Sequence, residues 1–351
     1  MDSEEAWLIV AMPKTHNYLF EYIVNFENLY GAYLKARRCK RYRKEVLIFS
    51  RNVEEELLTL REELVLGTYK TGHYRKFIIY EPKKREISAL PFRNRVVHHA
   101  ICTVIDPLFE KKFIKDSYAC RIGKGTHAAA DRLVAFLRHA QRIWENVYCL
   151  KSDISKFFPS INHEVLKDII RRTIRCKRTL HLIDEIIDSA PEGIGMPIGN
   201  LTSQLFANAY LNDLDHFVKE EMQVRFYIRY MDDFVLLHYD KKQLHTWKSE
   251  IEGYLTDKLH LQLNLKTSVS PISQGVDFVG YRTWTTHRLL RKRSIIGMKR
   301  KLRKLSRLYK TNERTLADIR QVIASWLGHA KHANSYNVVK RVLGGVVFSR
   351  R

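Results

Sequence analysis

The chain lacks an apolar run long enough to span a bilayer, and it contains few cysteines. Its 5 cysteines are scattered and never stand in C-x-x-C spacing, so we expect reduced, structural thiols and no zinc ribbon. The opening residues, MDSEEAWLIVAMPK, begin acidic and hold too short an apolar stretch for a secretory signal. These absences argue against a membrane-spanning protein and against a disulfide-rich secreted domain, and they predict a cytoplasmic protein.

Acidic side chains are scarce relative to basic ones, with 38 Asp and Glu against 61 Lys and Arg, a net charge of +23. This excess predicts a polyanionic partner, either nucleic acid or an anionic membrane, and the lack of apolar runs makes the membrane the weaker alternative. Residues 291–351 alone hold 17 Lys and Arg against Glu313 and Asp318. With 45% hydrophobic and 11% aromatic residues, the chain is expected to form two or three domains with a sizeable core.

Helical and strand-like patterns alternate along the chain, which predicts an α+β fold. Hairpins are expected over 74–90, with Lys83 in the turn, and over 226–237. A single strand is expected over 147–155, and short strands with turns over 261–284. The helices expected from apolar spacing cover 17–66, 92–109, a segment that Thr126 would cap, 162–190, 201–222, 242–259 and 291–351.

Two adjacent carboxylates, Asp232 and Asp233, stand at the tip of the second hairpin in the sequence RYMDDFVLL. Adjacent carboxylates repel one another and are costly to bury, so a cation is expected beside them, and hard oxygen ligands suit Mg²⁺. The alternative is ordinary turn chemistry, because Asp tolerates turns. Asp153, in the strand VYCLKSDI, is a third carboxylate in apolar surroundings. Together they would build a site for two metal ions about 4 Å apart, as polymerases and nucleases use.

A series of ordered sequence blocks carries a more specific signal. SDISKFFPSI resembles the palm motif of reverse transcriptases that bears the first metal-binding Asp, and YMDD is similar to the signature that bears the second. The blocks KKREISALPF, RNRVVHHAI, GMPIGNLTSQ, LNLKTS and DFVGY also resemble that family and follow its order, over about residues 68–282. The resemblance implies a right-hand polymerase, an α+β fold with a ferredoxin-like antiparallel palm sheet. It divides this chain into a basic helical extension (1–50), fingers (51–150), a palm (151–284) and a basic helical thumb (285–351).

The resemblance also implies roles for individual positions. It makes Asp153, Asp232 and the backbone carbonyl of Ile154 the ligands of two Mg²⁺ ions, for which Mn²⁺ can substitute, and it makes Asp233 a supporting catalytic carboxylate. Phe158 matches an aromatic gate beneath the sugar, which favours deoxynucleoside triphosphates; plain core packing is the alternative. The further positions implied are Lys83, Arg85, Phe157, Ile198, Gly199, Gln204 and Lys266 around the incoming nucleotide, and Gly280 and Tyr281 in a primer grip. A solvated charged turn is the alternative for Arg85, and an ordinary surface lysine is the alternative for Lys266.

The block GMPIGNLTSQ departs from most reverse transcriptases, which place Gln where this chain has Ile198. This form, with YACRIGKGTHAA and SWLGHAKHA, resembles the enzymes of diversity-generating retroelements of bacteria and their phages. The resemblance implies a cytoplasmic enzyme of a bacterial host cell that copies a template-repeat RNA into cDNA, with errors at template adenines, for mutagenic retrohoming into a target gene. It also implies two partners, a structured RNA and a small basic helical accessory protein that is expected to be oligomeric.

Three alternatives stay open. In the first, Ile198 is a neutral packing substitution. In the second, the chain is a group II intron or retron reverse transcriptase of ordinary fidelity, although the IGNLTSQ form and the absence of an endonuclease or zinc module argue against the full intron protein. In the third, it is an RNA-binding scaffold with a silent polymerase site, against which the three intact carboxylates argue.

Weaker signals lie elsewhere in the chain. The loop RIGKGT, with Arg121, Lys124 and Gly125, is a candidate cradle for template phosphates. Segment 299–310 alternates apolar and basic residues at helical spacing, so one face can pack while the other binds phosphate. His329 and His332 stand three apart, and packing or RNA contact is expected of them rather than metal binding, because no Cys or acidic ligand stands nearby.

Overall fold

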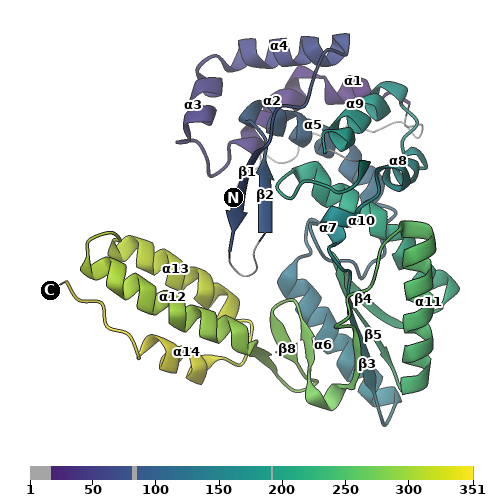
Figure 1. Cartoon of the computed structure of the whole chain (residues 1–351), viewed down its shortest axis with the longest axis vertical. Coiled ribbons are helices and arrows are strands. Elements are labelled where there is room, and N and C mark those ends of the chain that lie inside the picture. Colours follow the sequence, from purple (N-terminus) through teal and green to yellow (C-terminus); the bar gives the residue numbers. More distant parts are fainter. Residues whose placement is uncertain (1–16, 81–84, 191–192, 351) are drawn as a thin grey trace, which may run out of the picture. The chain divides into compact units, whose positions relative to one another are not determined.

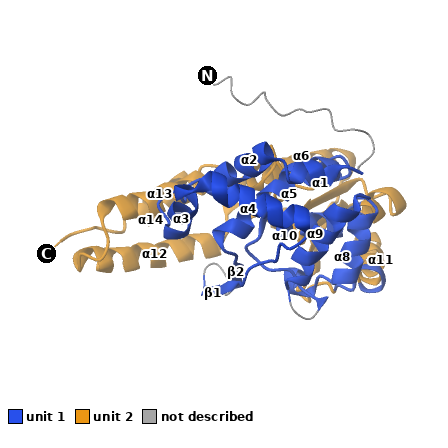
Figure 2. Ribbon diagram, turned by 90° about the horizontal axis from the view of Figure 1, so that it is seen from above, with its two compact units in different colours: residues 1–114, 156–215, 256–261 blue, residues 115–155, 216–255, 262–351 orange. Residues whose placement is uncertain are grey.

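The computed structural model describes residues 17–80, 85–190 and 193–350. The chain divides into two compact units, and each unit is assembled from segments that are far apart in the sequence (Figure 2). Unit 1 comprises residues 1–114, 156–215 and 256–261, and unit 2 comprises residues 115–155, 216–255 and 262–351. The division into extension, fingers, palm and thumb stays a prediction.

Unit 1 is mainly helical, with local signals that start and stop its helices. Asn25 caps α2 by accepting a hydrogen bond from the Glu27 backbone N–H at 2.8 Å. Gly67 ends α4 with φ +71°, the left-handed conformation that glycine adopts without steric cost. Helices α2 and α5 pack along each other, and Asn28 donates to the Ala100 carbonyl between them at 3.2 Å. The helices of unit 1 are α1 (Leu19–Ile23), α2 (Phe26–Ala36), α3 (Lys44–Arg51), α4 (Val53–Leu66), α5 (Phe92–Glu110), α7 (Phe157–Ser160), α8 (His163–Arg171), α9 (Lys177–Asp188) and α10 (Leu201–His216).

A two-stranded antiparallel hairpin, β1 (Arg75–Ile79) and β2 (Arg85–Ala89), projects from these helices (Figure 1). All five residues of β1 are exposed, so the hairpin contributes little to the core of its unit. The base of β2 is tied to a loop far along the chain, because the Ser88 backbone N–H donates to the Ile198 carbonyl at 2.9 Å.

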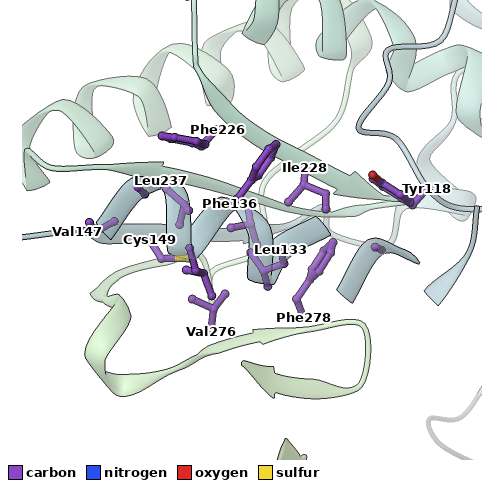
Figure 3. Close-up of a cluster of buried hydrophobic side chains, with 14 residues drawn as sticks. Tyr118, Leu133, Phe136, Val147, Cys149, Phe226, Ile228, Leu237, Val276 and Phe278 are labelled. Carbon is purple, nitrogen blue, oxygen red and sulfur yellow. The ribbon is translucent and has the colours of Figure 1, made fainter. Parts of the chain in front are cut away.

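Unit 2 is built on a four-stranded antiparallel sheet with the strand order β4-β5-β3-β6. Its strands are β3 (Tyr148–Asp153), β4 (Phe226–Tyr230), β5 (Asp233–His238) and β6 (Ser268–Pro271). Helix α6 (Thr126–Ile143) covers one face of this sheet with Leu133, Phe136 and Leu137. Figure 3 shows Phe136 and Leu133 of α6 directed toward Phe226, Ile228 and Leu237 of the sheet. Burial of these apolar side chains stabilises the sheet and so holds its strand ends in place.

The remainder of unit 2 is a three-stranded sheet followed by a helical region. The sheet consists of β7 (Val276–Phe278), β8 (Tyr281–Thr283) and β9 (Arg288–Leu290). Helices α12 (Lys292–Lys310), α13 (Leu316–Ala330) and α14 (Tyr336–Leu343) pack against one another (Figure 1). Met298 and Leu302 of α12 and Val342 of α14 form a buried cluster, against which Val322 and Ile323 of α13 pack. The described parts of the unit also contain α11 (Lys241–Leu259), which continues into residues of unit 1, and two short turns, η2 (Phe217–Glu221) and η3 (Ile272–Gln274).

Several sequence predictions are confirmed and two need correction. The hairpins, the strand that bears Asp153 and the basic helix over 299–310 form as expected, and the five cysteines are free thiols. The N-cap of α6 is Gly125 rather than Thr126, which is the first helical residue. The turn of the second hairpin contains two residues, because Asp233 already begins β5. Over the described residues, no helix is both long and apolar enough to cross a membrane.

Candidate active site

The end of β3 brings two carboxylate-bearing residues opposite each other. Asp153 is the last residue of this central strand and pairs in register with Asp233, the first residue of β5. Directly opposed residues of an antiparallel pair have Cα atoms about 4.5–5.5 Å apart. Both residues are partly exposed, whereas Ser152, which precedes Asp153 in the strand, is buried. Because side chains alternate between the two faces of a strand, the Asp153 carboxylate lies on the accessible face at this end of the sheet.

The β4–β5 turn places Asp232 beside the same strand end. Met231, the first turn residue, has φ +56°, a conformation that residues other than glycine rarely adopt. Its carbonyl accepts a hydrogen bond at 3.0 Å from Nη1 of Arg229, whose side chain is fully buried. The Asp232 carbonyl accepts the Ile154 backbone N–H at 3.2 Å. The fold therefore brings together Asp153, Ile154 and Asp232, the three positions that sequence resemblance assigned to the metal ions.

Asn264 holds Asp153 at two points. Its backbone N–H donates to the Asp153 carbonyl at 2.8 Å, and its Nδ2 donates to Asp153 Oδ2 at 3.1 Å. Asn264 Oδ1 in turn accepts the Lys266 backbone N–H at 3.0 Å, while the Lys266 side chain is exposed. Sequence reasoning singled out Lys266 and missed Asn264, although both lie in the block LNLKTS. The signal that could have identified Asn264 is its short polar side chain, two positions before the lysine.

A lysine partly balances the charge at this edge. Lys151 Nζ lies 3.7 Å from Asp233 Oδ1, and both side chains are about one-third exposed. Lys151 stands two positions before Asp153, so the alternation of β3 puts both on one face of the strand. Sequence reasoning also missed this lysine. The signal that could have found it is the two-residue period of the strand VYCLKSDI, which puts Lys151 and Asp153 on the same face.

The chemistry of the donors at this edge fits a hard divalent cation. Carboxylate and backbone carbonyl oxygens are the ligands that Mg²⁺ prefers, and Asp153, Asp232 and Ile154 supply both kinds. No group of three or more His, Cys, Asp or Glu side chains close enough to hold a metal occurs in the part of the chain that the structure describes. Two carboxylates and one main-chain oxygen form a smaller donor set than that, so the metal assignment stays a prediction.

The aromatic pair after β3 separates into a buried and a partly exposed ring. Phe157 is 2% exposed and packs 6.4 Å from the ring of Tyr210 within unit 1. Phe158 is half-buried, and its carbonyl accepts the Met196 backbone N–H at 2.8 Å. Phe157 is therefore a core residue, while Phe158 is partly accessible, and its role as a sugar gate stays a prediction.

The loop with Ile198 and Gly199 lies against the base of β2. Gly199 has φ +137°, and a Cβ at this position would lie 2.6 Å from the Ser88 carbonyl oxygen, so only glycine fits. Ile198 is half-buried and Gln204 is exposed in the first turn of α10. Arg85 is exposed at the distal end of β2, paired with Ile79. The predicted Lys83 lies outside the described residues.

Gly280 and Tyr281, the predicted primer-grip positions, adjoin a cluster of histidines. Gly280 has φ +93°, and a Cβ there would meet His329 Cε1 at 3.1 Å. The buried Tyr281 hydroxyl lies 2.9 Å from His329 Nδ1 and 3.2 Å from His127 Nδ1, and the His332 ring stacks on His127 at 3.6 Å. Burial raises the pKa of Tyr281 to about 12. Burial, followed by the neighbouring imidazoles, lowers the pKa of both His127 and His329.

His329 and His332 thus pack against aromatic neighbours, as expected from the sequence, while the third histidine was missed. The sequence around His127, KGTHAA, gives no sign of its partners, because Tyr281 and His332 lie about 150 and 200 residues later in the chain. Two cations of the RIGKGT loop contact the segment just before it: Arg121 Nη1 donates to the Ser117 carbonyl at 2.8 Å, and Lys124 Nζ donates to the Lys115 carbonyl. The phosphate-binding role of this loop stays a prediction.

Comparison with known proteins places this geometry in a family. The family described as reverse transcriptase (RNA-dependent DNA polymerase) matches residues 74–283. Protein YkfC of Escherichia coli (strain K12) is 28% identical over 287 residues, which cover 69% of this chain and 73% of YkfC. Nuclear intron maturase 4, mitochondrial, of Arabidopsis thaliana is 24% identical over 90% of this chain and 45% of its own length.

Two further matches concern an intron protein and a solved structure. The group II intron-encoded protein LtrA of Lactococcus lactis subsp. cremoris is 22% identical, over 65% of this chain and 49% of LtrA. This chain therefore spans about half the length of the two intron-related proteins. The structure of apo telomerase from Candida tropicalis superposes with a TM-score of 0.51 at 14% identity, over 78% of this chain and 59% of that one, and it shows the shared α+β fold with antiparallel sheets.

Proposed function

Because the chain belongs to the reverse transcriptase (RNA-dependent DNA polymerase) family, we propose that it copies RNA into DNA at the edge of the palm sheet that carries Asp153 and Asp232. The observation that supports this site is the pairing of strand ends. Asp153 stands opposite Asp233 in register, and the Asp232 carbonyl accepts the N–H of Ile154. This arrangement gathers two carboxylates and a main-chain carbonyl at one accessible edge.

The residues at this edge have distinct proposed roles. Asp153, Asp232 and the Ile154 carbonyl would hold Mg²⁺, which when bound supplies Lewis-acid activation of the attacking 3′-hydroxyl and stabilisation of the leaving pyrophosphate. Asn264 orients the Asp153 carboxylate through Nδ2, and Lys151 lies near the Asp233 carboxylate. These neighbours position the carboxylates before substrate arrives, so less reorganisation is needed during the reaction.

Further residues are proposed to select and bind the incoming deoxynucleoside triphosphate. Phe158, which is half-buried, would exclude a 2′-hydroxyl with its ring, and the exposed guanidinium of Arg85 suits bidentate binding of phosphate. Lys83 and Gln204 are further candidates for nucleotide contact, Lys266 for a contact near the leaving phosphates, and Gly280 with Tyr281 for primer-strand contact. The basic helix α12 is a candidate for binding the RNA and the growing cDNA through phosphates.

Within this activity we propose the mutagenic retroelement subtype, which copies a template-repeat RNA with errors at template adenines and works with a small basic accessory protein. The support is the block IGNLTSQ and the apolar Ile198, which cannot make the hydrogen bonds of a Gln amide near the nucleotide. The Ile198 carbonyl accepts the Ser88 N–H, so its backbone is held while its side chain contributes shape alone.

A second candidate is a group II intron-like or retron reverse transcriptase of ordinary fidelity. The similarity to LtrA and to the intron maturase favours this candidate. The two candidates differ in the errors that they leave in cDNA, and not in the chemistry of the carboxylates.

Sequencing of primer-extension products tests both levels of the proposal. The purified chain would extend a DNA primer on a defined RNA template with Mg²⁺ and all four deoxynucleotides, as wild type and as Ile198→Gln. The mutagenic subtype requires substitutions mainly opposite adenine, at least about tenfold reduced in the variant. Accurate products from both proteins would support the second candidate, whereas a complete lack of DNA product with the accessory protein and native RNA present would contradict the proposed activity.

A further inference from the structure

Unit 2 contains a surface hollow that takes no part in the proposed chemistry. It has a volume of about 410 Å³ and lies between α6, the turn that joins β8 to β9, and the residues after α13. The helix contributes Asp131, Ala135 and Arg138, which share its outward face. A volume of this size falls within the range of small-ligand sites.

The hollow is built at a different turn from the one that carries Gly280 of the predicted primer grip. In the three-stranded sheet, Phe278 pairs with Tyr281 next to the β7–β8 turn, whereas Thr283 pairs with Arg288 next to the β8–β9 turn. The two turns therefore lie at opposite ends of β8. Gly280 belongs to the first turn, and the hollow is built at the second.

The β8–β9 turn presents an aromatic stack that is already fixed in place. The rings of Trp284 and His287 stack at 4.5 Å with an interplanar angle of 11°. Trp284 Nε1 donates to the Ser273 carbonyl at 3.0 Å, and a Cβ on Gly275 would lie 2.5 Å from the Trp284 ring, so glycine makes room for the indole. His287 is exposed at the open end of the stack. Such a ring can stack on an unpaired nucleobase with little loss of conformational entropy.

Cationic groups surround this stack. Arg288 is only 8% exposed; Nη2 binds Asp131 at 2.8 Å and Nη1 donates to the His332 carbonyl at 3.2 Å. Its buried Nε has no hydrogen-bond partner within the described parts of the chain, which is a costly state for a buried donor. Arg138 is exposed, and its Nε donates to the Thr285 carbonyl at 2.8 Å.

A neighbouring hollow extends the same surface along α6. It has a volume of about 450 Å³, shares Ala135 and Arg138 with the first hollow, and adds Arg142. Arg138 and Arg142 are one helical turn apart, so their guanidinium groups can contact successive phosphates of one strand. The combination of cations, an aromatic stack and space for a base is typical of surfaces that bind single-stranded nucleic acid.

We propose that this surface binds unpaired nucleotides of RNA, with a base stacked on His287 and the phosphates bound by Arg138 and Arg142. Thr286 and Asn334 also line the hollow; the Thr286 hydroxyl bonds His287 Nδ1 at 2.9 Å and Asn334 Oδ1 accepts the Arg288 N–H at 3.2 Å. The remaining hydroxyl lone pair of Thr286 and the Nδ2 donors of Asn334 suit a ribose 2′-hydroxyl. The inference deepens the proposed function, on which it rests, because it assigns part of the RNA partner to a surface distinct from the catalytic edge.

Oligonucleotide binding to the full chain tests the proposal. The chain is first saturated with a blocked RNA–DNA primer–template, without deoxynucleotides, and then titrated with a fluorescein-labelled 12-nucleotide unstructured RNA. Arg138→Glu is expected to weaken binding at least about fivefold and to reduce the slope of log Kd against log salt by about 0.7. Lys242→Glu makes the same charge change at an exposed position of α11 and should alter Kd less than about twofold.

A photocrosslink adds a positional readout. RNA that carries 4-thiouridine is expected to crosslink to the peptide that contains Trp284 and His287 in wild type and not in Ala135→Glu, which puts a carboxylate into the hollow. Equal affinities of Arg138→Glu and Lys242→Glu would overturn the proposal. Binding of DNA of the same sequence at equal or higher affinity, with the same dependence on Arg138, would overturn the assignment to RNA. No deoxynucleotide is present, so the binding measurement does not depend on polymerase activity. A chain that lacks activity can still bind RNA at this surface, and an active polymerase can lack the surface, so the two proposals fail separately.

Discussion

At the scale of single residues, the proposed site depends on backbone conformations that side chains rarely adopt. Met231, directly before Asp232, has φ +56°, and Lys156, directly before Phe157, has φ +45°. Each such residue costs on the order of 1 kcal/mol and persists only where its surroundings hold it in place. For Met231 that support includes the hydrogen bond from the buried Arg229 to its carbonyl. The placement of Asp232 therefore depends on its neighbours as much as on its own side chain.

Gly199→Ala is expected to destabilise the fold by about 2 kcal/mol or more. A Cβ would lie 2.6 Å from the Ser88 carbonyl oxygen, and the φ of +137° is unfavourable for alanine. Urea denaturation measures this change. Gly31→Ala is the matched control, because Gly31 lies inside α2 with nothing within 4 Å of its Cβ position, and alanine there should stabilise by about 0.5–1 kcal/mol. Equal effects of the two substitutions would show that the close approach of Gly199 to β2 is absent.

Phe158→Val is expected to relax selection against ribonucleotides. Removal of the ring opens space for a 2′-hydroxyl, so the ratio of kcat/KM for dCTP over CTP should fall by about 10- to 100-fold. Single-nucleotide incorporation with each substrate measures that ratio. Phe157→Leu changes the buried neighbour, and it should lower stability by about 1 kcal/mol while leaving the ratio unchanged. If Phe157→Leu alone altered the ratio, the gate would be assigned to the wrong ring.

At the scale of elements, the active edge is produced by pairing between segments about 80 and 110 residues apart. The end of β3 is held on one side by the β4–β5 hairpin and on the other by residues 262–264, since Ser155 N–H donates to the Gln262 carbonyl at 2.8 Å. The side-chain bond from Asn264 to Asp153 then fixes the carboxylate that the strand presents. Three separate segments thus determine the position of one functional group.

Asn264→Ala is expected to lower kcat by about 10- to 100-fold and to raise the Mg²⁺ concentration required for half-maximal activity. The substitution removes the donor to Asp153 Oδ2 while leaving the backbone bond intact. A Mg²⁺ titration of primer extension, accompanied by a thermal unfolding curve, measures both effects. Asn264→Asp, which keeps the size but adds a negative charge beside Asp153, should be at least as impaired. An unchanged Mg²⁺ requirement in Asn264→Ala would contradict an orienting role.

The sequence predicted which elements form and which residue types carry the chemistry, because both leave local patterns. Alternation in VYCLKSDI and the doubled Asp in RYMDDFVLL located the strand, the hairpin and three carboxylates. The partners of these groups could not be predicted in the same way. Strand register and burial create the contacts of Asn264, Lys151 and Arg229. The stack of Trp284 on His287 likewise depends on a tertiary contact, because Gly275 leaves room for the indole ring.

At the scale of the whole molecule, each unit is made from interleaved segments, and no linker-like stretch marks their boundaries. The sequence suggested four consecutive regions, because composition and motifs are read along the chain. Compact units depend on contacts across the chain, and residues such as Asn28 and Ala100 share a hydrogen bond over 72 positions. Truncation at a region boundary is therefore a poor way to isolate function, and each experiment proposed here uses the full chain.

Acidification is expected to destabilise unit 1 through buried histidines. Burial lowers the pKa of His98 to about 3 and that of His99 to about 4, and His98 Nδ1 is bonded to Thr202 Oγ1 at 2.8 Å. Because the folded chain keeps these rings neutral, the unfolded chain binds more protons as pH falls below about 6.5. The His98 contribution to the free energy of unfolding is complete above that pH and should fall by about 1 kcal/mol between pH 7 and pH 5.5.

Urea denaturation at both pH values, for wild type and His98→Asn, measures this contribution. Burial raises the pKa of Asp106 to about 6, so this carboxyl acts in the opposite direction, and subtracting the variant removes its effect. The difference in stability between wild type and variant should shrink at pH 5.5. A difference that stays constant or grows would show that His98 is protonated in the folded chain.

Single-turnover incorporation of one deoxynucleotide on an RNA template tests the central claim most directly. Asp232→Asn keeps the size of the side chain and removes its charge, and we expect a rate at least about 10³-fold lower than wild type, with affinity for the primer–template within about twofold. Asp257→Asn, an exposed carboxylate of α11, should be indistinguishable from wild type. Incorporation by Asp232→Asn within tenfold of wild type would contradict the assignment of catalysis to the edge where Asp153 and Asp232 meet.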